Sequence, residues 1–208
     1  PWMQKLPGGL IHVNVVGCAL FAAISGSSAA TVATVGKMSI PELRKRKYPE
    51  KILLGSLAGS GTLGLLIPPS IILIIYGVAV QESIAKLFIA GIIPGIMIAL
   101  IFMSYVIIWS LMNKKDMPKI IEDYSFLEKI KRSKQLLPVI ILILSVIGSI
   151  YSGVATATEA ASLGVVGALI LSYFQKSLTL DTFKSSLLGA TKTSCMIAFI
   201  LAGSTFLS

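Results

Sequence analysis

Two short clusters of hydroxyl and small side chains lie inside otherwise apolar stretches of this chain, and both carry groups that can bind a cation. The first cluster is Ser25-Gly26-Ser27-Ser28, and the second runs from Gly59 to Ser70 and contains Thr62 and the pair Pro68-Pro69. An alkali cation needs several hard oxygen ligands in a compact and nearly dry cage. Hydroxyl groups, together with the backbone carbonyls that are freed where a helix breaks, supply such ligands without burying a full negative charge.

The second cluster interrupts an apolar segment, residues 52–80, that is long enough to cross a membrane as a helix. Pro68 removes a backbone donor, leaves the carbonyl of Gly64 without its helical partner, and disfavours the helical conformation at Ile67. Lipid offers no partner for freed backbone groups, so a break at bilayer depth is tolerated only inside protein or beside water. Two such breaks in one chain are typical of the ion and substrate sites of secondary transporters, and we predict that they face each other.

The candidate ligands are the residues of both breaks that offer a hydroxyl group or an accessible carbonyl group: Ser25, Ser27, Ser28, Gly61, Thr62 and Ser70. The N-termini of half-helices that face the same place would attract a carboxylate substrate, because the helix dipole is positive there. An alternative is that the glycine, serine and threonine residues only let membrane helices pack closely. The presence of two breaks, one of them with a Pro-Pro pair, favours a binding site.

The composition indicates an integral membrane protein. The chain has 208 residues, of which 55% are hydrophobic and 13% are charged, and its mean hydropathy is +0.88. Residues 87–112 contain no charged side chain and exceed the ~20 residues that a spanning helix needs. Within them, Gly91 and Gly95 would allow the close approach of a neighbouring helix. The basic residues behind the net charge of +9 lie in short loops between apolar runs, which favours a lipid bilayer and argues against nucleic acid.

The order of apolar and charged segments predicts the path of the chain through the membrane. Residues 10–36 form two short apolar runs around a tip at 25–28, which is the pattern of a re-entrant hairpin. The positive-inside rule assigns the basic cluster that follows, from Lys37 to Lys51, to the cytoplasm. Residues 113–135 are highly charged, with apolar residues at spacings of three and four, which predicts a helix on the inner surface or, alternatively, a solvated loop.

The last part of the chain contains three further apolar segments. Two of them, residues 136–151 and 160–174, are expected to cross the membrane outward and back. Glu159 stands at the start of the second segment, where it would cap the helix N-terminus or, alternatively, take part in coupling. The amphipathic piece 180–188 leads into an apolar run, 190–207, in which the sequence stops, so we expect a longer polypeptide.

The sequence offers little for catalysis. His12, the single histidine, lies on an apolar segment and is better explained as a core residue than as a base or ligand. Ser27 could be compared with the nucleophile of an intramembrane serine hydrolase, but no partner for it is evident. Cys18 and Cys195 have neither disulfide nor zinc spacing. We therefore predict that the protein is not an enzyme and binds no metal other than an alkali ion.

Three motifs stand out along the chain. They are the run from Ser25 to Gly36, the run from Gly61 to Ser70 with Tyr76-Gly77 after it, and the run from Gly153 to Ala161. These motifs resemble the large membrane subunit of the tripartite ATP-independent periplasmic (TRAP) transporters. The resemblance extends over essentially the whole chain, and the middle motif is the most specific of the three.

The resemblance implies an all-α polytopic membrane protein that works as an elevator-type transporter. Its fold would consist of inverted repeats, each with a re-entrant hairpin and a broken transmembrane helix. Residues 1–112 would then be the first-repeat transport region, with the hairpin at 10–36, the broken helix at 52–80 and a spanning helix at 87–112. Residues 113–135 would be a cytoplasmic connector, and residues 136–208 would be the start of the second repeat.

By the same resemblance, the first sodium site would be formed by Ser25, Ser27, Ser28, Gly61, Thr62, Ile67 and Pro68, and the substrate would contact Ser28, Thr62 and Ser70. The resemblance implies sodium-driven import of organic acids, such as dicarboxylates or sialic acid, across the bacterial inner membrane. The partners would be a periplasmic substrate-binding protein and a small membrane subunit. The residues alone reach only a cation-coupled transporter. An alternative is a structural membrane subunit that anchors partners without transporting anything.

Overall fold

The computed structural model describes residues 2–118, 128 and 133–207. Across these residues the chain is helical and contains no β-strand, which confirms the predicted all-α class. The chain divides into two compact units, Pro1–Ile74 with Lys86–Leu136, and Ile75–Ala85 with Leu137–Ser208. The predicted breaks, at residues 25–28 and 59–70, both belong to the first unit.

Two helices, α1 (His12–Ser25) and α2 (Ser28–Lys45), form a hairpin, and the 3-10 turn η1 (Gly9–Ile11) leads into it. Gly26 ends α1 in the left-handed conformation, with φ 58°, a region that suits glycine because it has no Cβ. Ser27 is extended and caps α2, where its side chain accepts a hydrogen bond from the N–H of Ala30. The chain therefore turns at residues 26–27, within the predicted tip.

Helix α2 is longer than the predicted second arm of the hairpin, which ended at residue 36. Its buried residues Val35, Ser39 and Leu43 recur every four positions, so the face that packs against the unit continues beyond the apolar run. Part of the predicted basic cluster therefore lies on a helix rather than in a loop.

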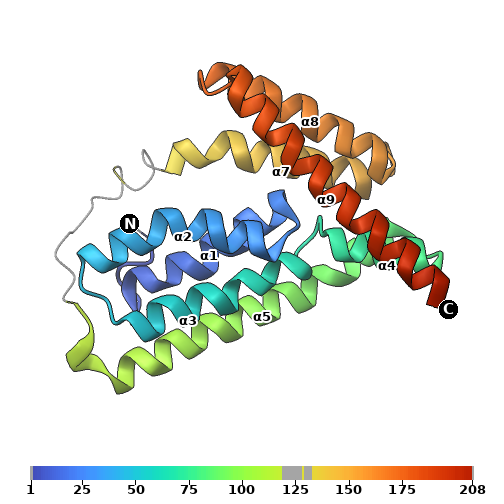
Figure 1. The fold of residues 1–208 in the computed structure, drawn as a ribbon. Helices are drawn as coiled ribbons and strands as arrows, with labels where there is room; N and C mark the ends of the chain where they lie inside the picture. Colours follow the sequence, from blue (N-terminus) through green and yellow to red (C-terminus); the bar gives the residue numbers. More distant parts are fainter. Residues whose placement is uncertain (1, 119–127, 129–132, 208) are drawn as a thin grey trace. The chain divides into compact units, whose positions relative to one another are not determined.

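The segment predicted as a broken helix consists of α3 (Glu50–Gly61), the 3-10 turn η2 (Thr62–Leu65), an irregular stretch and α4 (Ile71–Val80), as Figure 1 shows. The break is narrower than predicted, because α-helical structure persists through Gly61. The prolines that remove backbone donors come only at Pro68 and Pro69, and the peptide bond between them is cis.

Two clusters of buried side chains hold the hairpin against α3 and against α5 (Ile84–Met112). Near the start of α1, Ile11 packs with Ile52 and Val106. Farther along α1, Cys18 packs with Val35 and Leu57. Helices α1 and α3 consequently run side by side in the same direction, with the tip and the break at the same end (Figure 1).

A short 3-10 turn, η3 (Lys114–Asp116), follows α5. Most of the segment 113–135, for which we predicted a surface helix or a loop, falls at 119–127 and 129–132, outside the described residues. The description resumes before η4 (Lys134–Leu136).

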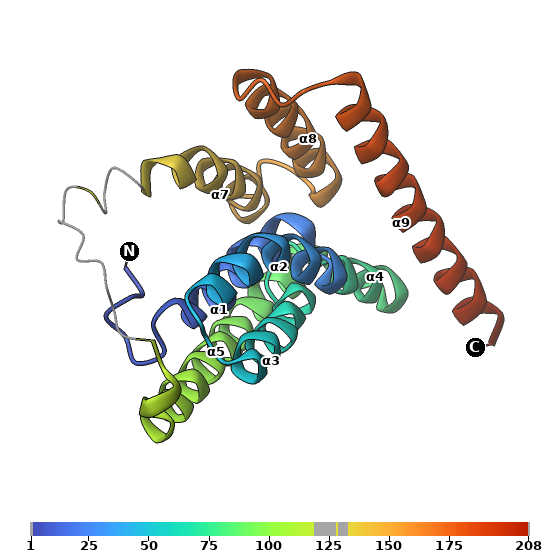
Figure 2. The ribbon, with the colours of Figure 1, turned by 60° about the vertical axis from the view of Figure 1, so that its left-hand side comes forward.

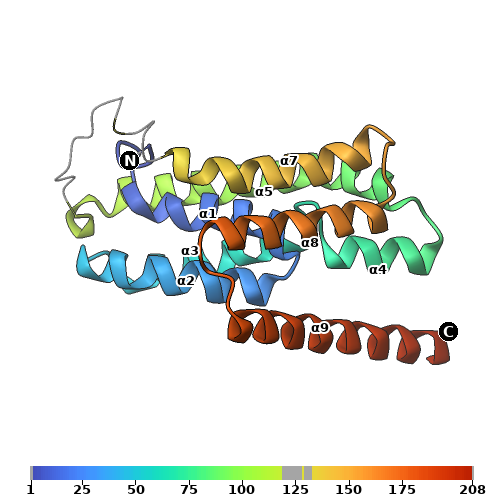
Figure 3. The ribbon, with the colours of Figure 1, turned by 90° about the horizontal axis from the view of Figure 1, so that it is seen from above.

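The second unit contains α7 (Leu137–Tyr151), α8 (Ala157–Phe174) and α9 (Leu180–Leu207). Helices α7 and α8 pack as an antiparallel pair (Figure 3). Glu159 caps α8 as predicted, because its carboxylate accepts hydrogen bonds from the N–H and the hydroxyl group of Thr156, both at 2.8 Å. The predicted pieces 180–188 and 190–207 are one uninterrupted helix, α9 (Figure 2).

Three helices are long and apolar enough to cross a membrane within the described part of the chain. They are Ile84–Met112, Ala157–Phe174 and Leu180–Phe206. Apolar side chains such as Ile93 and Leu100 are exposed along α5, which suits a helix that meets lipid.

Candidate functional site: two facing backbone breaks

The tip of the hairpin and the break between α3 and α4 are in contact. A methyl group on Gly64 would lie 3.2 Å from the backbone N of Ser28 and 3.2 Å from the carbonyl carbon of Ser27. A methyl group on Gly26 would lie 3.2 Å from the carbonyl oxygen of Pro69. Contacts this short are tight for a Cβ atom, so glycine suits both positions, and at Gly26 the left-handed backbone favours glycine as well. The hairpin tip and the second break therefore face each other in this structure.

Four helix ends converge where the breaks meet. The C-terminal ends of α1 and α3 bring carbonyl groups and the negative ends of their dipoles, which favour a cation. The N-terminal ends of α2 and α4 bring N–H groups and the positive ends of their dipoles, which favour an anion. The backbone N of Ile71, at the start of α4, lies 3.2 Å from the position of a methyl group on Gly26. This arrangement can hold a cation and a carboxylate close together.

Hydrogen bonds inside the hairpin fix the shape of its tip. The Ser25 hydroxyl donates to the Ser27 carbonyl oxygen over 3.0 Å and accepts from the N–H of Ser27 over 3.1 Å. The Thr31 hydroxyl donates to the same carbonyl oxygen over 2.8 Å. The polar groups of Ser25 and Ser27 are thus engaged in building the turn.

Ser28 differs from its neighbours at the tip. Its Oγ atom is buried and has no hydrogen-bond partner among the described residues. Its carbonyl oxygen faces Gly61, where a methyl group would lie 3.7 Å away. A buried hydroxyl group without a partner costs about 1–3 kcal/mol, so this atom is the group at the contact that most needs a ligand.

The predicted site residues around the second break have side chains that are bonded elsewhere or point away from the contact. Ser70 is fully buried, and its hydroxyl donates to the Leu65 carbonyl oxygen over 2.8 Å. Thr62 is exposed, and its hydroxyl donates over 2.7 Å to the Gly59 carbonyl oxygen of its own helix. The side chain of Ile67 packs against α5, so only its carbonyl group could serve as an ion ligand. Of the predicted hydroxyl groups, Ser28 is thus placed best for a ligand.

Two glycines of α5 support the second break from its other side. A methyl group on Gly91 would lie 2.8 Å from the Leu66 carbonyl oxygen, and one on Gly95 would lie 3.0 Å from Cγ1 of Ile67. From the sequence we expected only that these glycines would allow the close approach of a neighbouring helix. The structure identifies that neighbour as the break in the same chain, a role that the small-residue spacing alone does not indicate.

Replacing Gly91 with alanine is expected to lower the free energy of unfolding by about 1–3 kcal/mol, because the added methyl group would push the Leu66 carbonyl aside. The matched control is Gly55→Ala in α3, where a methyl group would meet nothing within 4 Å. The control should stabilise its helix by about 0.5–1 kcal/mol. The thermal unfolding midpoint of the purified protein measures both effects, and equal midpoints for the two variants would contradict the expected cost at Gly91.

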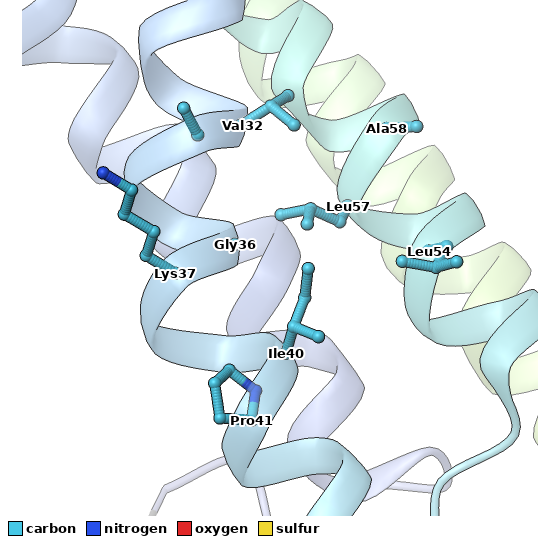
Figure 4. Close-up of a pocket in the computed structure, with 9 residues that line it drawn as sticks. Val32, Gly36, Lys37, Ile40, Pro41, Leu54, Leu57 and Ala58 are labelled. Atoms are coloured by element: carbon cyan, nitrogen blue, oxygen red, sulfur yellow. The ribbon is translucent and has the colours of Figure 1, made fainter.

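An apolar groove of about 680 Å³ lies between α2 and α3 (Figure 4). Apart from Lys37 its lining side chains are apolar, and they include Val32, Ile40, Leu54 and Leu57. The Lys37 side chain points away from α3 (Figure 4). The groove therefore lacks the polar groups that a carboxylate substrate would need, and the contact between the breaks is the better candidate site.

Other candidate chemistry receives no support from the described residues. His12 is fully buried, and its Nε2 atom lies 2.8 Å from the Pro7 carbonyl oxygen, as befits the predicted core residue. It begins α1 whereas Ser27 follows its end, about 20 Å away, so the two cannot form a catalytic pair. No three His, Cys, Asp or Glu side chains gather into a metal-binding group within residues 2–118, 128 and 133–207.

Comparison with known proteins gives one consistent result. Residues 4–208 match the family model described as "Tripartite ATP-independent periplasmic transporter, DctM component". The chain is 38% identical to the C4-dicarboxylate TRAP transporter large permease protein DctM of Pseudomonas aeruginosa, over 94% of the chain and 45% of the relative. It is also 38% identical to the ectoine/5-hydroxyectoine TRAP transporter large permease protein UehC of Ruegeria pomeroyi, over 97% of the chain and 46% of the relative.

A third relative is the sialic acid TRAP transporter large permease protein SiaM of Vibrio cholerae, which is 36% identical over 96% of the chain and 46% of the relative. The chain thus spans about half the length of these curated relatives. They are transporter components and not enzymes, which agrees with the prediction from the sequence.

Proposed function

The chain belongs to the DctM component family of tripartite ATP-independent periplasmic transporters, and on that premise we propose that its facing breaks bind sodium and one side of an organic-acid substrate. The observation that carries the proposal is the contact of the tip at 25–28 with Gly64 and Pro69. In a membrane, unwound backbone is stable only where such a contact or a cavity protects it.

The residues at the contact fit a hard alkali cation. The Ser28 hydroxyl would gain the partner that it lacks, and carbonyl groups at the ends of α1 and α3 would complete the oxygen ligands. The bound ion would add a positive charge beside the site, which favours an anionic substrate. Ser25, Ser27, Gly61 and Gly64 would act by shaping the backbone, while Thr62, Ile67, Pro68 and Ser70 would contribute from the second break.

The names of the relatives support a carboxylate as the substrate. C4-dicarboxylates, sialic acid and ectoine, for which three relatives are named, all carry a carboxylate group. The N-terminal ends of α2 and α4, which meet at the contact, would orient such a group. Selection among organic acids would then depend on the rest of each molecule.

Family membership also supports the wider assembly. The chain would act in the bacterial inner membrane as a multi-pass subunit, beside a small membrane subunit and a periplasmic substrate-binding protein. The hairpin α1–α2 would be re-entrant, and the transport region would move as an elevator relative to a fixed scaffold. Residues 136–208 would begin a second, inverted repeat.

The test is uptake into liposomes that contain the transporter to which this chain belongs, with its small subunit and with substrate supplied on the binding protein. An inward sodium gradient should drive accumulation of the organic acid above equilibrium, and replacing sodium with potassium should abolish it. Accumulation that is equal in potassium would disprove sodium coupling. Normal transport by variants with altered breaks would favour the alternative of an anchoring subunit.

A further inference from the structure

A buried polar cluster links α1 to α3 far from the candidate site. Asn14 is fully buried, and its Nδ2 atom donates to the Leu53 carbonyl oxygen over 3.1 Å and to the Ser56 Oγ atom over 3.0 Å. The Ser60 hydroxyl lies 2.5 Å from the Ser56 carbonyl oxygen and 3.4 Å from the Asn14 carbonyl oxygen. Nothing in the proposed transport chemistry uses these groups.

The orientation of the Asn14 amide follows from its partners. The Leu53 carbonyl oxygen can only accept, so the NH₂ group of Asn14 must face it. The Ser56 hydroxyl donates to the same carbonyl oxygen over 3.0 Å, which leaves its lone pairs for the second hydrogen of the amide. Both amide hydrogens are thus committed to α3, and each bond has a narrow range of acceptable geometry.

These bonds tie one position on α1 to one turn of α3. The neighbouring contact of Cys18 with Leu57 is a packing contact without the directional requirement of a hydrogen bond, so it constrains the axial position of α1 less sharply. The bonds of Asn14 constrain it more sharply, because sliding by one residue moves α1 by about 1.5 Å along the helix axis. At the other end, a methyl group on Gly64 would already lie 3.2 Å from the tip, so a shift of this size would open the contact or cause a collision.

The cluster lies on the same two helices that lead to the contact. Asn14 precedes Gly26 by 12 residues along α1, and Ser56 lies in the last two turns of α3, which ends at Gly61. A rise of 1.5 Å per residue places the cluster about 18 Å from the tip. We propose that Asn14, through its hydrogen bonds to Leu53 and Ser56, is a positioning residue that sets the axial register of α1 on α3 and thereby the geometry of the proposed sodium site. This inference rests on the proposed function.

The test compares Asn14→Leu with the wild type in sodium-driven uptake by the complete transporter. The sodium concentration for half-maximal uptake should rise about tenfold, as expected for the loss of one or two hydrogen bonds. The control is Asn113→Leu. Among the described residues the Asn113 amide donates only to the Trp109 carbonyl oxygen in the last turn of α5, over 2.9 Å, so its loss should leave this concentration unchanged. If Asn14→Leu does not fold, Ser56→Ala replaces it. If the variant shows the same half-maximal sodium concentration as the wild type, the proposal is overturned, even if the amount of folded protein is lower.

A second measurement does not depend on transport. A cysteine is introduced by Leu57→Cys, and an added oxidant then joins it by a disulfide to the native Cys18, its neighbour in the core. Cys195 and any other cysteine are first replaced by serine so that no other disulfide can form. Adding Asn14→Leu should slow the formation of this disulfide severalfold, because the register of α1 is no longer held. If the disulfide forms in the Asn14→Leu variant as fast as it does with Asn14 present, the inference is overturned. If disulfide formation is slowed but transport by the wild type needs no sodium, only the proposed sodium site is overturned.

Discussion

Replacing Gly64 with valine is expected to reduce sodium-dependent uptake to the background of empty liposomes. The first side-chain carbon at this position would already lie 3.2 Å from the backbone of Ser27 and Ser28, and the two further methyl groups of valine leave no room for the tip. The tip would be displaced, and the helix ends that converge there would separate. Uptake by the reconstituted transporter measures the effect.

Gly55→Val is the matched control for this prediction. Gly55 lies on α3, two to three turns before Gly64, and a methyl group there would meet nothing within 4 Å. This variant should therefore keep sodium-dependent uptake. If the two variants transport equally well, the contact between the breaks has no role in transport.

Replacing Ser28 with alanine is expected to raise the sodium concentration for half-maximal uptake about tenfold, which corresponds to ~1.4 kcal/mol of lost binding energy. The hydroxyl of Ser28 is the buried group at the tip that has no partner among the described residues. Its removal costs the folded protein no hydrogen bond shown in the structure, so the thermal unfolding midpoint should not fall.

Thr62→Val provides the comparison for Ser28, because both residues were predicted as ligands from the sequence. The Thr62 side chain is exposed and its hydroxyl donates to Gly59, so its loss should change the half-maximal sodium concentration much less. Unchanged sodium dependence in both variants would defeat the assignment of the site. A larger effect at Thr62 would mean that the second break supplies the hydroxyl ligand.

Local features of the fold could be predicted from the sequence because they depend on backbone chemistry over a few residues. The left-handed Gly26 with Ser27 after it produces the tip, and Pro68 prevents the helix from continuing. Glu159, three residues after Thr156, forms a capping box by the same local logic. These positions, together with the apolar composition, were sufficient to predict a helical membrane protein whose backbone is broken at two places.

The full length of α2 could not be predicted in this way. Its second half is polar in composition, and it remains helical because Val35, Ser39 and Leu43 face the rest of the unit. Periodic burial of this kind is decided by neighbours that are distant in the sequence. The same holds for Gly91 and Gly95, whose spacing is equally suited to a second helix or a second molecule.

The sequence by itself thus determined where the backbone breaks and which oxygen atoms become available there, because proline and glycine act on their immediate neighbours. Only the tertiary structure decided which of those atoms face one another. Ser28 is turned into the contact and Thr62 away from it, and the choice depends on how α1, α3 and α5 pack. Within a regular helix the direction of one side chain follows from that of its neighbours. Across a break this relation is lost, so packing against distant parts of the chain sets the direction.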